Sequence, residues 1–366
     1  MGSNAIGRHY TLTTAGESHG PGYVGIIDGV PSGFKIVHEE IQRDLDLRAP
    51  GRSHFSSQRK EPDQVEILAG IYEGFTTGAP IAFFVPNRDQ RSKDYDFLKD
   101  QLRPGHADFT YLEKYGHPDL RGGGRASARE TLCRVVAGSI AKQILRNYDI
   151  DLLADVRQIQ NVRAPEYFDP LPTARERVLN DPFGCHDPSA SADWRILLEK
   201  AMEEKDSLSS SVCFRIDPML QSLGEPVYNK LTNKLADALM SIPAAKGFIL
   251  GDINTLQTKT GSEFNDPYVE KNGSIRPIKN DMAGILGGIS TGEPIFGELF
   301  FKPPSSVGKQ QISQGKTLTI NGRHDPLLAP RARIVVESML WITLMDFFLL
   351  FQTQLHLKRD VACHAK

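Results

Sequence analysis

The chain has 366 residues, which is enough to bury a large core in one elaborate domain or in two ordinary ones. Hydrophobic residues make up 40% and charged residues 24% of the chain, as in folded globular proteins. The 43 basic and 45 acidic residues leave a net charge of −2, which argues against a general nucleic-acid binder because such proteins are usually basic. A site for an anion must therefore be built from a local group of basic residues.

The cysteines and the apolar segments indicate the compartment. No CxxC pair occurs among the four widely spaced cysteines Cys133, Cys185, Cys213 and Cys363. Neither a zinc site nor a disulfide framework is indicated, and reduced thiols in a reducing compartment are the simpler interpretation. The N-terminus lacks the basic start and apolar run of a secretory signal. The most apolar stretch, 339–351, is interrupted by Asp346 and is shorter than the roughly 20 residues of a membrane span. We expect a core or subunit-interface helix there, no membrane, and a cytoplasmic protein.

The first polar turn of interest connects two strands. Alternation over 10–14 and 24–28 predicts these strands, with Ser18 and His19 on the connection between them. Adjacent side chains point apart, so these two residues do not suggest a nucleophile–base pair. Each could contribute separately to a ligand site, or the segment could be an ordinary turn. A short amphipathic helix is predicted over 39–48.

The remaining elements are predicted from pattern and turn chemistry. Strands are expected at 65–72, 80–85, 150–159, 209–216, 246–250 and 316–320. Helices are expected at 192–205 and from Glu225 to a stop at Pro243, and irregular surface at 161–193. The polar segment 263–278 predicts a hairpin with its tip at Asn272-Gly273. The polar stretches 52–60 and 87–103 predict solvated loops or flaps.

A glycine-rich segment occurs twice in the chain. Residues 70–81 align without gaps on residues 284–295, with seven of the twelve positions identical. Each copy is followed, after a loop, by a long apolar helix, one predicted from Ala126 to Asn147 and the other from about Arg331. Two similar halves sharing one core are therefore expected, and the whole chain 1–366 is predicted to form a single pseudo-symmetric domain.

The first of these helices follows three consecutive glycines, Gly122 to Gly124. Glycine lets the backbone adopt conformations closed to other residues and approach a ligand closely. A loop of this kind before a helix start favours anions, because free N–H groups and the helix dipole point the same way. Fixed positive charge surrounds the segment at Arg121, Arg125, Arg129 and Arg134. On spacing alone, phosphate binding and an ordinary loop before a core helix carry equal weight.

Two further turns combine polar residue types. Residues 103–108, Arg-Pro-Gly-His-Ala-Asp, place His106 beside aromatic residues, where it could be an acid–base group or a buried structural residue. Residues 321–326, Asn-Gly-Arg-His-Asp-Pro, place arginine, histidine and aspartate side by side. Turn chemistry alone would explain that composition, but the same residues would also make a polar reaction face.

Taken together, these segments resemble the chorismate synthase family from about Ile6 to about Phe351. The resemblance rests on motifs in the right order at 16–20, 103–108, 122–131, 241–247, 302–306 and 322–326. It implies an α+β fold, a β-α-β sandwich with paired long helices enclosed by antiparallel sheets, usually in a homotetramer. It also implies the 1,4-anti elimination of phosphate from 5-enolpyruvylshikimate 3-phosphate to give chorismate. This reaction requires reduced FMN, here supplied by an external reducing system, although it involves no net redox change.

The resemblance also implies roles for individual residues. His19 is expected to be the acid at the departing phosphate, His106 to lie against the flavin ring, and Asp325 to help the flavin accept the substrate proton, with Ser18 and Ser127 in support. The substrate-anion arginines are expected to be Arg48, Arg129 and Arg134. The flavin-binding set is expected to be Arg125, Ala126, Ser127, Gly287, Lys302, Pro303, Pro304, Ser305, Ser306 and Arg323, with no metal. This chain has His54 where many relatives have arginine, and Ala126 where serine is common.

Two other function classes make different predictions. A conventional flavin-dependent oxidoreductase should oxidise a reduced nicotinamide such as NADPH rapidly, but no added segment resembles a reductase domain, so we expect a monofunctional enzyme. A non-catalytic phospho-ligand binding protein would keep its ligand after His19→Ala and would have no turnover to lose.

Overall fold

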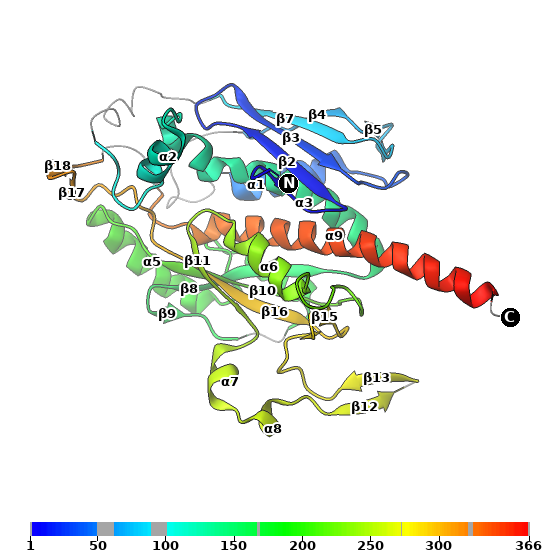
Figure 1. The fold of residues 1–366 in the computed structure, drawn as a ribbon. Helices are drawn as coiled ribbons and strands as arrows, with labels where there is room; N and C mark the ends of the chain where they lie inside the picture. The colour runs from blue at the N-terminus through cyan, green and yellow to red at the C-terminus, as the bar shows by residue number, and fades with distance from the viewer. Residues whose placement is uncertain are drawn as a thin grey trace.

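Two five-stranded antiparallel sheets enclose a layer of helices in the computed structural model, which describes residues 2–49, 62–88, 101–166, 169–271, 273–320 and 325–364 (Figure 1). The first sheet runs in the order β1 (Ala5–Ile6), β2 (Thr11–Gly16), β3 (Gly22–Asp28), β7 (Ile81–Pro86) and β4 (Glu66–Ala69). The second runs in the order β11 (Ala245–Leu250), β16 (Ile295–Phe301), β10 (Ser210–Ile216), β8 (Leu152–Ile159) and β9 (Val162–Arg163). The predicted α+β sandwich is confirmed.

The helices and small hairpins complete the architecture. The helices are α1 (His38–Arg48), α2 (Asp108–Tyr115), α3 (Thr131–Leu145), α4 (Leu171–Asn180), α5 (Pro188–Glu203), α6 (Leu231–Met240), α7 (Ile253–Thr258), α8 (Gly261–Phe264) and α9 (Ala329–His364). The hairpins are β5–β6 (Ile71–Tyr72, Phe75–Thr76), β12–β13 (Tyr268–Lys271, Ser274–Pro277), β14–β15 (Ile285–Leu286, Ile289–Ser290) and β17–β18 (Gln311–Ser313, Lys316–Leu318).

The two long helices α3 and α9 lie against each other between the sheets. Both are apolar on most of their faces, and one cluster of buried side chains takes in these helices and both sheets. A Cβ atom at Gly138 would lie 2.5 Å from the Cα atom of Ser338, so glycine lets the two backbones come into contact. Each fully buried leucine or isoleucine in this layer contributes about 1.5–3 kcal/mol to folding.

Helix α9 explains the most apolar stretch of the sequence. Its segment Ala329–Leu355 is 27 residues long, more than the sequence suggested, and is apolar enough to cross a membrane by length and composition. However, 72% of its most apolar window is buried inside the protein, so it is a core helix. Asp346, which interrupts the apolar run, accepts hydrogen bonds from the backbone N–H groups of Arg8 at 2.8 Å and Tyr10 at 3.0 Å. The carboxylate thus fixes the chain just before β2.

The internal repeat corresponds to two hairpins with the same contacts. Thr76, at the end of β6, accepts a hydrogen bond on Oγ1 from the backbone N–H of Phe34 at 2.9 Å. Ser290, at the end of β15, accepts a hydrogen bond on Oγ from the backbone N–H of Leu223, also at 2.9 Å. The strand order β2-β3-β7-β4 of one half matches the order β8-β10-β16-β11 of the other. The helices α3 and α9 occupy corresponding positions in the two halves, each after its hairpin.

The glycine-rich segment differs from the prediction. Gly122, Gly123 and Gly124 have φ angles of 59°, 86° and 51°, and Ser127 is extended with a ψ of 136°, so helix α3 begins at Thr131 and not at Ala126. Two short 3-10 turns, 121–126 and 128–130, precede the helix, with Ser127 extended between them. The segment is therefore a tightly folded loop that leads into the helix.

Other boundaries also differ from the sequence expectations. Residues 161–193 are not irregular throughout, because they contain α4. Helix α5 begins at Pro188, where the Asp187 side chain accepts a hydrogen bond from the backbone N–H three residues further on at 2.7 Å. Helix α6 begins at Leu231 and not at Glu225. The predicted strand 65–72 is split between β4 and β5, and the hairpin turn precedes β6.

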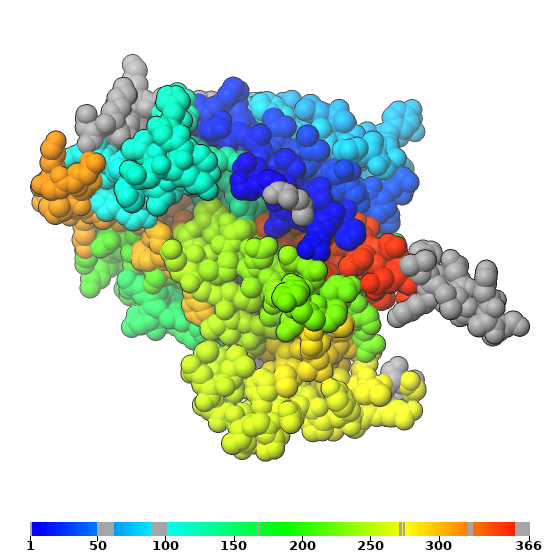
Figure 2. Space-filling model, viewed as in Figure 1, coloured from blue at the N-terminus to red at the C-terminus, as the bar shows by residue number. Residues whose placement is uncertain are grey.

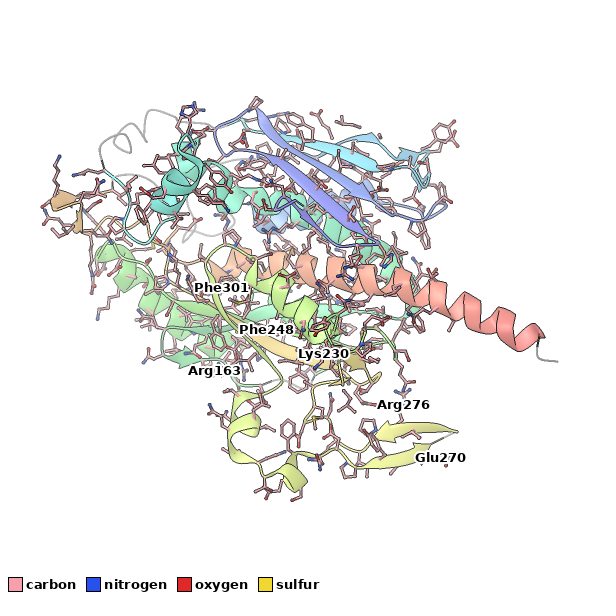
Figure 3. The ribbon with its side chains drawn as sticks, viewed as in Figure 1. Arg163, Lys230, Phe248, Glu270, Arg276 and Phe301 are labelled. Carbon is pink, nitrogen blue, oxygen red and sulfur yellow. The ribbon has the colours of Figure 1, made fainter. Side chains whose placement is uncertain are left out.

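Helices α7 and α8 and the hairpin β12–β13 form an arm that projects from the body of the molecule (Figures 1 and 2). Lys271 pairs with Ser274 across the hairpin, which confirms the predicted hairpin, and Asn272 of its expected tip lies outside the described residues. Glu270 and Arg276 lie on its two strands (Figure 3).

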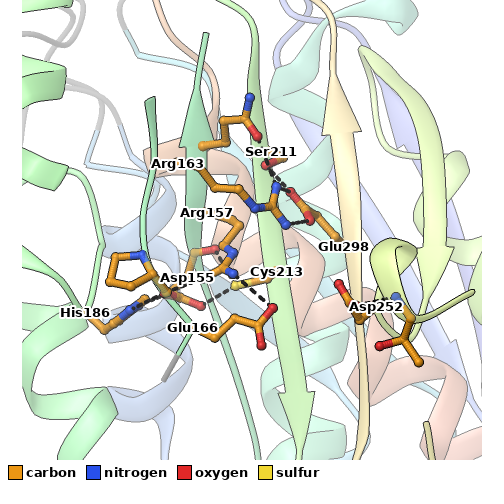
Figure 4. Close-up of polar contacts among 12 residues, drawn as sticks. Asp155, Arg157, Arg163, Glu166, His186, Ser211, Cys213, Asp252 and Glu298 are labelled. Carbon is orange, nitrogen blue, oxygen red and sulfur yellow. Dashed lines mark hydrogen bonds and ion pairs between the residues drawn. The ribbon is translucent and has the colours of Figure 1, made fainter. Parts of the chain in front are cut away.

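A buried polar network lies on the face of the second sheet opposite α9 (Figure 4). Asp155 on β8 lies 2.5 Å from His186 Nδ1 and accepts a hydrogen bond from Cys213 Sγ at 2.8 Å. Arg163 pairs with Glu298 on β16 at 2.6 Å. Because these groups satisfy one another, the network contributes to the fold of the second half.

Candidate active site

A cavity of about 850 Å³ opens where α3 and α9 begin. Small-molecule sites in proteins usually enclose roughly 300–1,000 Å³, so this cavity is large enough for more than one small ligand. The start of α3 contributes Arg129 and Glu130 to the cavity wall, and the start of α9 contributes Leu328 and Arg331. Two helix N-termini therefore face the same space, and their dipoles add to the attraction for anions.

The glycine-rich loop packs directly against two histidines. A Cβ atom at Gly122 would lie 2.4 Å from His19 Cδ2 and 2.5 Å from Ser18 Oγ. A Cβ atom at Gly123 would lie 3.2 Å from His106 Cε1. No larger residue fits at Gly122 without displacing His19. The loop thus holds both histidines beside one cavity wall.

His19 is buried in a turn that a neighbouring strand braces. Asn87, just after β7, donates hydrogen bonds from Nδ2 to the carbonyls of Glu17 at 3.0 Å and Gly20 at 2.8 Å. Its Oδ1 atom accepts a hydrogen bond from Arg129 Nε at 2.6 Å. Asn87 therefore connects the His19 turn to an arginine of the cavity wall.

His106 is oriented by a buried ion pair. Asp108 receives hydrogen bonds at 2.7 Å from both Arg103 Nε and Arg103 Nη2, and its Oδ1 atom lies 2.7 Å from His106 Nδ1. Burial alone would raise the pKa of Asp108, but hydrogen bonds from Arg103 and His106 outweigh burial and hold this pKa well below its ordinary value. The ionised carboxylate fixes Nδ1 of the imidazole, and the opposite edge of the ring faces the glycine-rich loop.

Three arginines and two carboxylates form a second charged group. Asp63 pairs with Arg48 and, at 2.8 Å, with Arg129. Burial would raise the pKa of Asp63, but the charges and hydrogen bonds of both arginines lower it below its ordinary value. Arg331 donates from Nε to the carbonyl of Arg48 at 2.9 Å and pairs with Asp325. Burial lowers the pKa of Arg331. The carboxylates thus hold the arginines in place and leave the group with net positive charge.

Two more arginines lie on the same wall. Arg134 pairs with Glu130 at 2.6 Å and donates from Nη1 to Ser241 Oγ at 2.7 Å. Arg125 donates from Nη2 to Asn4 Oδ1 at 3.1 Å. Its Nη1 atom is buried and has no hydrogen-bond partner within the part of the chain that the structure describes. This donor, on a residue of the cavity wall, is suited to an oxygen atom of a ligand.

The segment after β16 closes the opposite side of the cavity. Ser305 donates from Oγ to the carbonyl of Gly105 at 2.7 Å, and Lys302 donates from Nζ to the same carbonyl at 3.2 Å. This links the second half of the chain to the residue next to His106.

Most of the sequence-predicted residues meet at this cavity. Those that line it are Arg48, His106, Arg125, Ala126, Ser127, Arg129, Arg134, Lys302, Pro304, Ser305, Ser306 and Asp325. Ser18 and His19 are not among the lining residues, but they contact the glycine-rich loop, whose Gly122 lines the cavity. Gly287, in the turn between β14 and β15, and Pro303 are not among the lining residues. Arg323 and His54 lie outside the described residues.

Sequence reasoning missed three of the residues that organise the site. Asp63 and Asn87 act through contacts with residues distant in sequence, and nothing in their local patterns marks them. Asp108 stood inside a recognised motif, and its spacing of two residues from His106 was a signal that could have identified the pair.

An α+β sandwich whose paired long helices begin at a cationic cavity is suited to an enzyme for a small, multiply anionic ligand. The chorismate synthase family model matches residues 10–349. The chain is 46% identical over 352 residues to chorismate synthase of Porphyromonas gingivalis, covering 94% of this chain and 95% of the relative. It is 43% identical to that of Methanococcoides burtonii, with 94% and 96% covered. A solved chorismate synthase structure superposes with a TM-score of 0.74 at 27% identity, covering 94% of this chain and 93% of that one. The chain belongs to the chorismate synthase family, and it is accordingly a lyase.

Proposed function

We propose that this chain catalyses the 1,4-anti elimination of phosphate from 5-enolpyruvylshikimate 3-phosphate, giving chorismate. The C–O bond to phosphate breaks, a ring C–H bond breaks on the opposite face, and the ring double bond shifts as a second one forms. Atoms and electrons balance without an oxidant. The observation that carries the proposal is the meeting of two helix starts, the arginine group and His106 at one cavity, with His19 packed against Gly122 of the cavity wall.

We assign substrate binding to the arginines. The substrate carries a phosphate and two carboxylates, and Arg48, Arg129 and Arg134 line the cavity as fixed cations. Arg48 and Arg129 are almost fully buried, so their attraction for an anion is screened less than at a surface. Asp63 sets their positions before the ligand arrives, which reduces the reorganisation that binding requires.

We assign His19 as the acid at the leaving phosphate. Contact with the glycine-rich loop and the hydrogen bonds that Asn87 donates to the turn hold His19 in one place, with Ser18 beside it. Protonation or charge stabilisation of the departing oxygen lowers the barrier because the charge develops next to preorganised donors.

The cavity also fits reduced FMN. Arg125 Nη1 is a buried donor without a hydrogen-bond partner in the described ranges, and Lys302, Ser305 and Ser306 offer further donors for a phosphate. We propose that these residues, with Ala126, Ser127, Pro303, Pro304, Gly287 and Arg323, hold the flavin. When bound, reduced FMN would supply electron density and a proton acceptor to the reaction, and it would end unchanged. His106 would lie against the flavin ring, and Asp325, held by Arg331, would assist the removal of the ring proton.

Anaerobic turnover tests this function. The protein is mixed with dithionite-reduced FMN and the enolpyruvyl substrate, and phosphate and chorismate are measured together. Equal amounts of both products are expected. Phosphate release without chorismate, or no release at all, would contradict the proposal. We also propose that an external flavin reductase supplies the electrons, so NADPH and FMN in air should give no turnover.

We further propose a homotetramer of single-domain subunits in the cytoplasm. Val24 and Ile26 on β3 are 39% and 46% exposed, and Phe84, opposite Val24 on β7, adds to the same apolar face. Apolar sheet faces of this kind often mark subunit contacts. Light scattering measures the mass in solution, and a monomer at micromolar concentration would refute the assembly.

A further inference from the structure

Lys246 lies at an irregularity next to the cavity. In the pairing of β11 with β16, Ala245 is opposite Phe301 and Gly247 is opposite Phe300, so Lys246 is the extra residue of a β-bulge. Phe301 marks the end of β16 in Figure 3. Bulges next to active sites redirect a side chain away from the regular alternation of the strand.

The backbone before the bulge is also unusual. Ala244 has a φ of 69°, a left-handed conformation that costs a residue with a side chain on the order of 1–3 kcal/mol. Its carbonyl accepts a hydrogen bond from the backbone N–H of Lys302 at 3.1 Å. Backbone strain of this kind persists where the surrounding structure requires it. Here the left-handed conformation of Ala244 places its carbonyl, two residues before Lys246, against the backbone of Lys302.

Lys246 and Lys302 both line the cavity. Burial and the positive charge of Lys246 lower the pKa of Lys302, so the two ammonium groups are close enough to repel each other. Within the described ranges neither lysine forms an ion pair, and Lys302 Nζ contacts only the oxygens of Gly105, Pro303 and Ser305. In contrast to the two lysines, Arg48 and Arg129 are ion-paired, because they share the carboxylate of Asp63. An anion at the lysine pair would remove the repulsion.

We propose that Lys246, together with Lys302, binds the phosphate monoester dianion of a ligand in the cavity. This inference rests on the proposed function, in which the flavin and the substrate each bring one such group. Two compact ammonium charges match a dianion, and the hydroxyls of Ser305 and Ser306 on the same wall are suitable partners for its oxygens.

Titration of flavin fluorescence tests the proposal with Lys246→Gln, Lys246→Arg and Lys302→Gln. Lys246→Gln should weaken about 10-fold the binding of the ligand whose phosphate the lysine pair holds. Oxidised FMN and riboflavin differ by the phosphate, so if that ligand is FMN, riboflavin should bind unchanged. Lys246→Arg should restore most of the affinity. A second arm titrates the enolpyruvyl substrate in the presence of FMN. A loss confined to FMN assigns the flavin phosphate, and a loss confined to the substrate assigns the substrate phosphate; either result supports the proposal.

Lys200→Gln, on the exposed face of α5 and away from the cavity wall, is the matched control and should change neither affinity. The proposal is overturned if Lys246→Gln binds FMN and the substrate as tightly as the unaltered protein. It is also overturned if riboflavin affinity falls as much as FMN affinity, because the phosphate would then play no part. Should the unaltered protein bind neither FMN nor the substrate, the proposed function itself would fail, and this inference with it. Unfolding curves confirm that the variants are folded.

Discussion

Replacing Gly122 with alanine should lower turnover about a hundredfold while the protein stays folded. The new Cβ atom would lie 2.4 Å from the His19 ring, whereas ordinary contacts begin at 3.4 Å. The imidazole must therefore retreat by about 1 Å, and a misplacement of that size costs about 10²-fold in rate. Gly122 also has a φ of 59°, where a side chain adds about 1–2 kcal/mol of strain.

Gly74→Ala is the matched control for the backbone strain. Gly74 has a similarly positive φ of 81°, but a Cβ atom added there would meet nothing within 4 Å, and the residue is in the hairpin turn before β6. This variant should lose similar stability and keep its turnover. The assay is anaerobic phosphate release with reduced FMN, together with urea unfolding of each variant. Equal kcat values for the two variants would refute the argument that the loop positions His19.

The remaining predictions concern single side chains. His19→Ala should lower kcat about 10²–10⁴-fold and leave the substrate bound in a calorimetric titration; unchanged kcat would exclude His19 as the acid. Asp108→Asn should destabilise the fold by about 3–5 kcal/mol in urea unfolding, because it removes the ionised acceptor of two hydrogen bonds from buried Arg103. The folded pKa of Asp108 lies below the ordinary 3.8, so its stabilisation is present above that pH and is lost as pH falls through the folded pKa. The stability of Asp108→Asn should accordingly fall less steeply below pH 3.8 than that of the unaltered protein. Burial and the charge of Asp155 raise the pKa of the Cys213 thiol well above its ordinary value, so iodoacetamide at neutral pH should leave Cys213 unmodified in peptide mass spectra.

Local patterns were enough to predict the two long helices, whereas the sandwich was expected from the family resemblance. Apolar spacing predicted α3 and α9, and the repeated glycine hairpin predicted that they occupy matching places in two halves. Such features depend on contacts within a few residues, which the sequence displays directly. The polar turns were also recognisable, because glycine, proline and asparagine restrict the backbone locally.

The features that sequence missed depend on distant contacts. Asp63 forms ion pairs with Arg48 and Arg129, and Asn87 connects the His19 turn to Arg129 through hydrogen bonds. Neither contact has a local signature, because it exists only after the sheet and helices have packed. The late start of α3 was missed for a different reason: the apolar spacing begins only at Leu132 and does not locate the helix start, and the extended Ser127 keeps the helix from starting at Ala126.

A crystal structure of the complex with oxidised FMN and 5-enolpyruvylshikimate 3-phosphate tests the central claim most directly. We predict both molecules in the cavity at the starts of α3 and α9, with the substrate phosphate within hydrogen-bond distance of His19, about 2.6–3.2 Å, and the flavin beside Asp325. Electron density for either molecule outside this cavity, or a substrate phosphate beyond the reach of His19, would contradict the account.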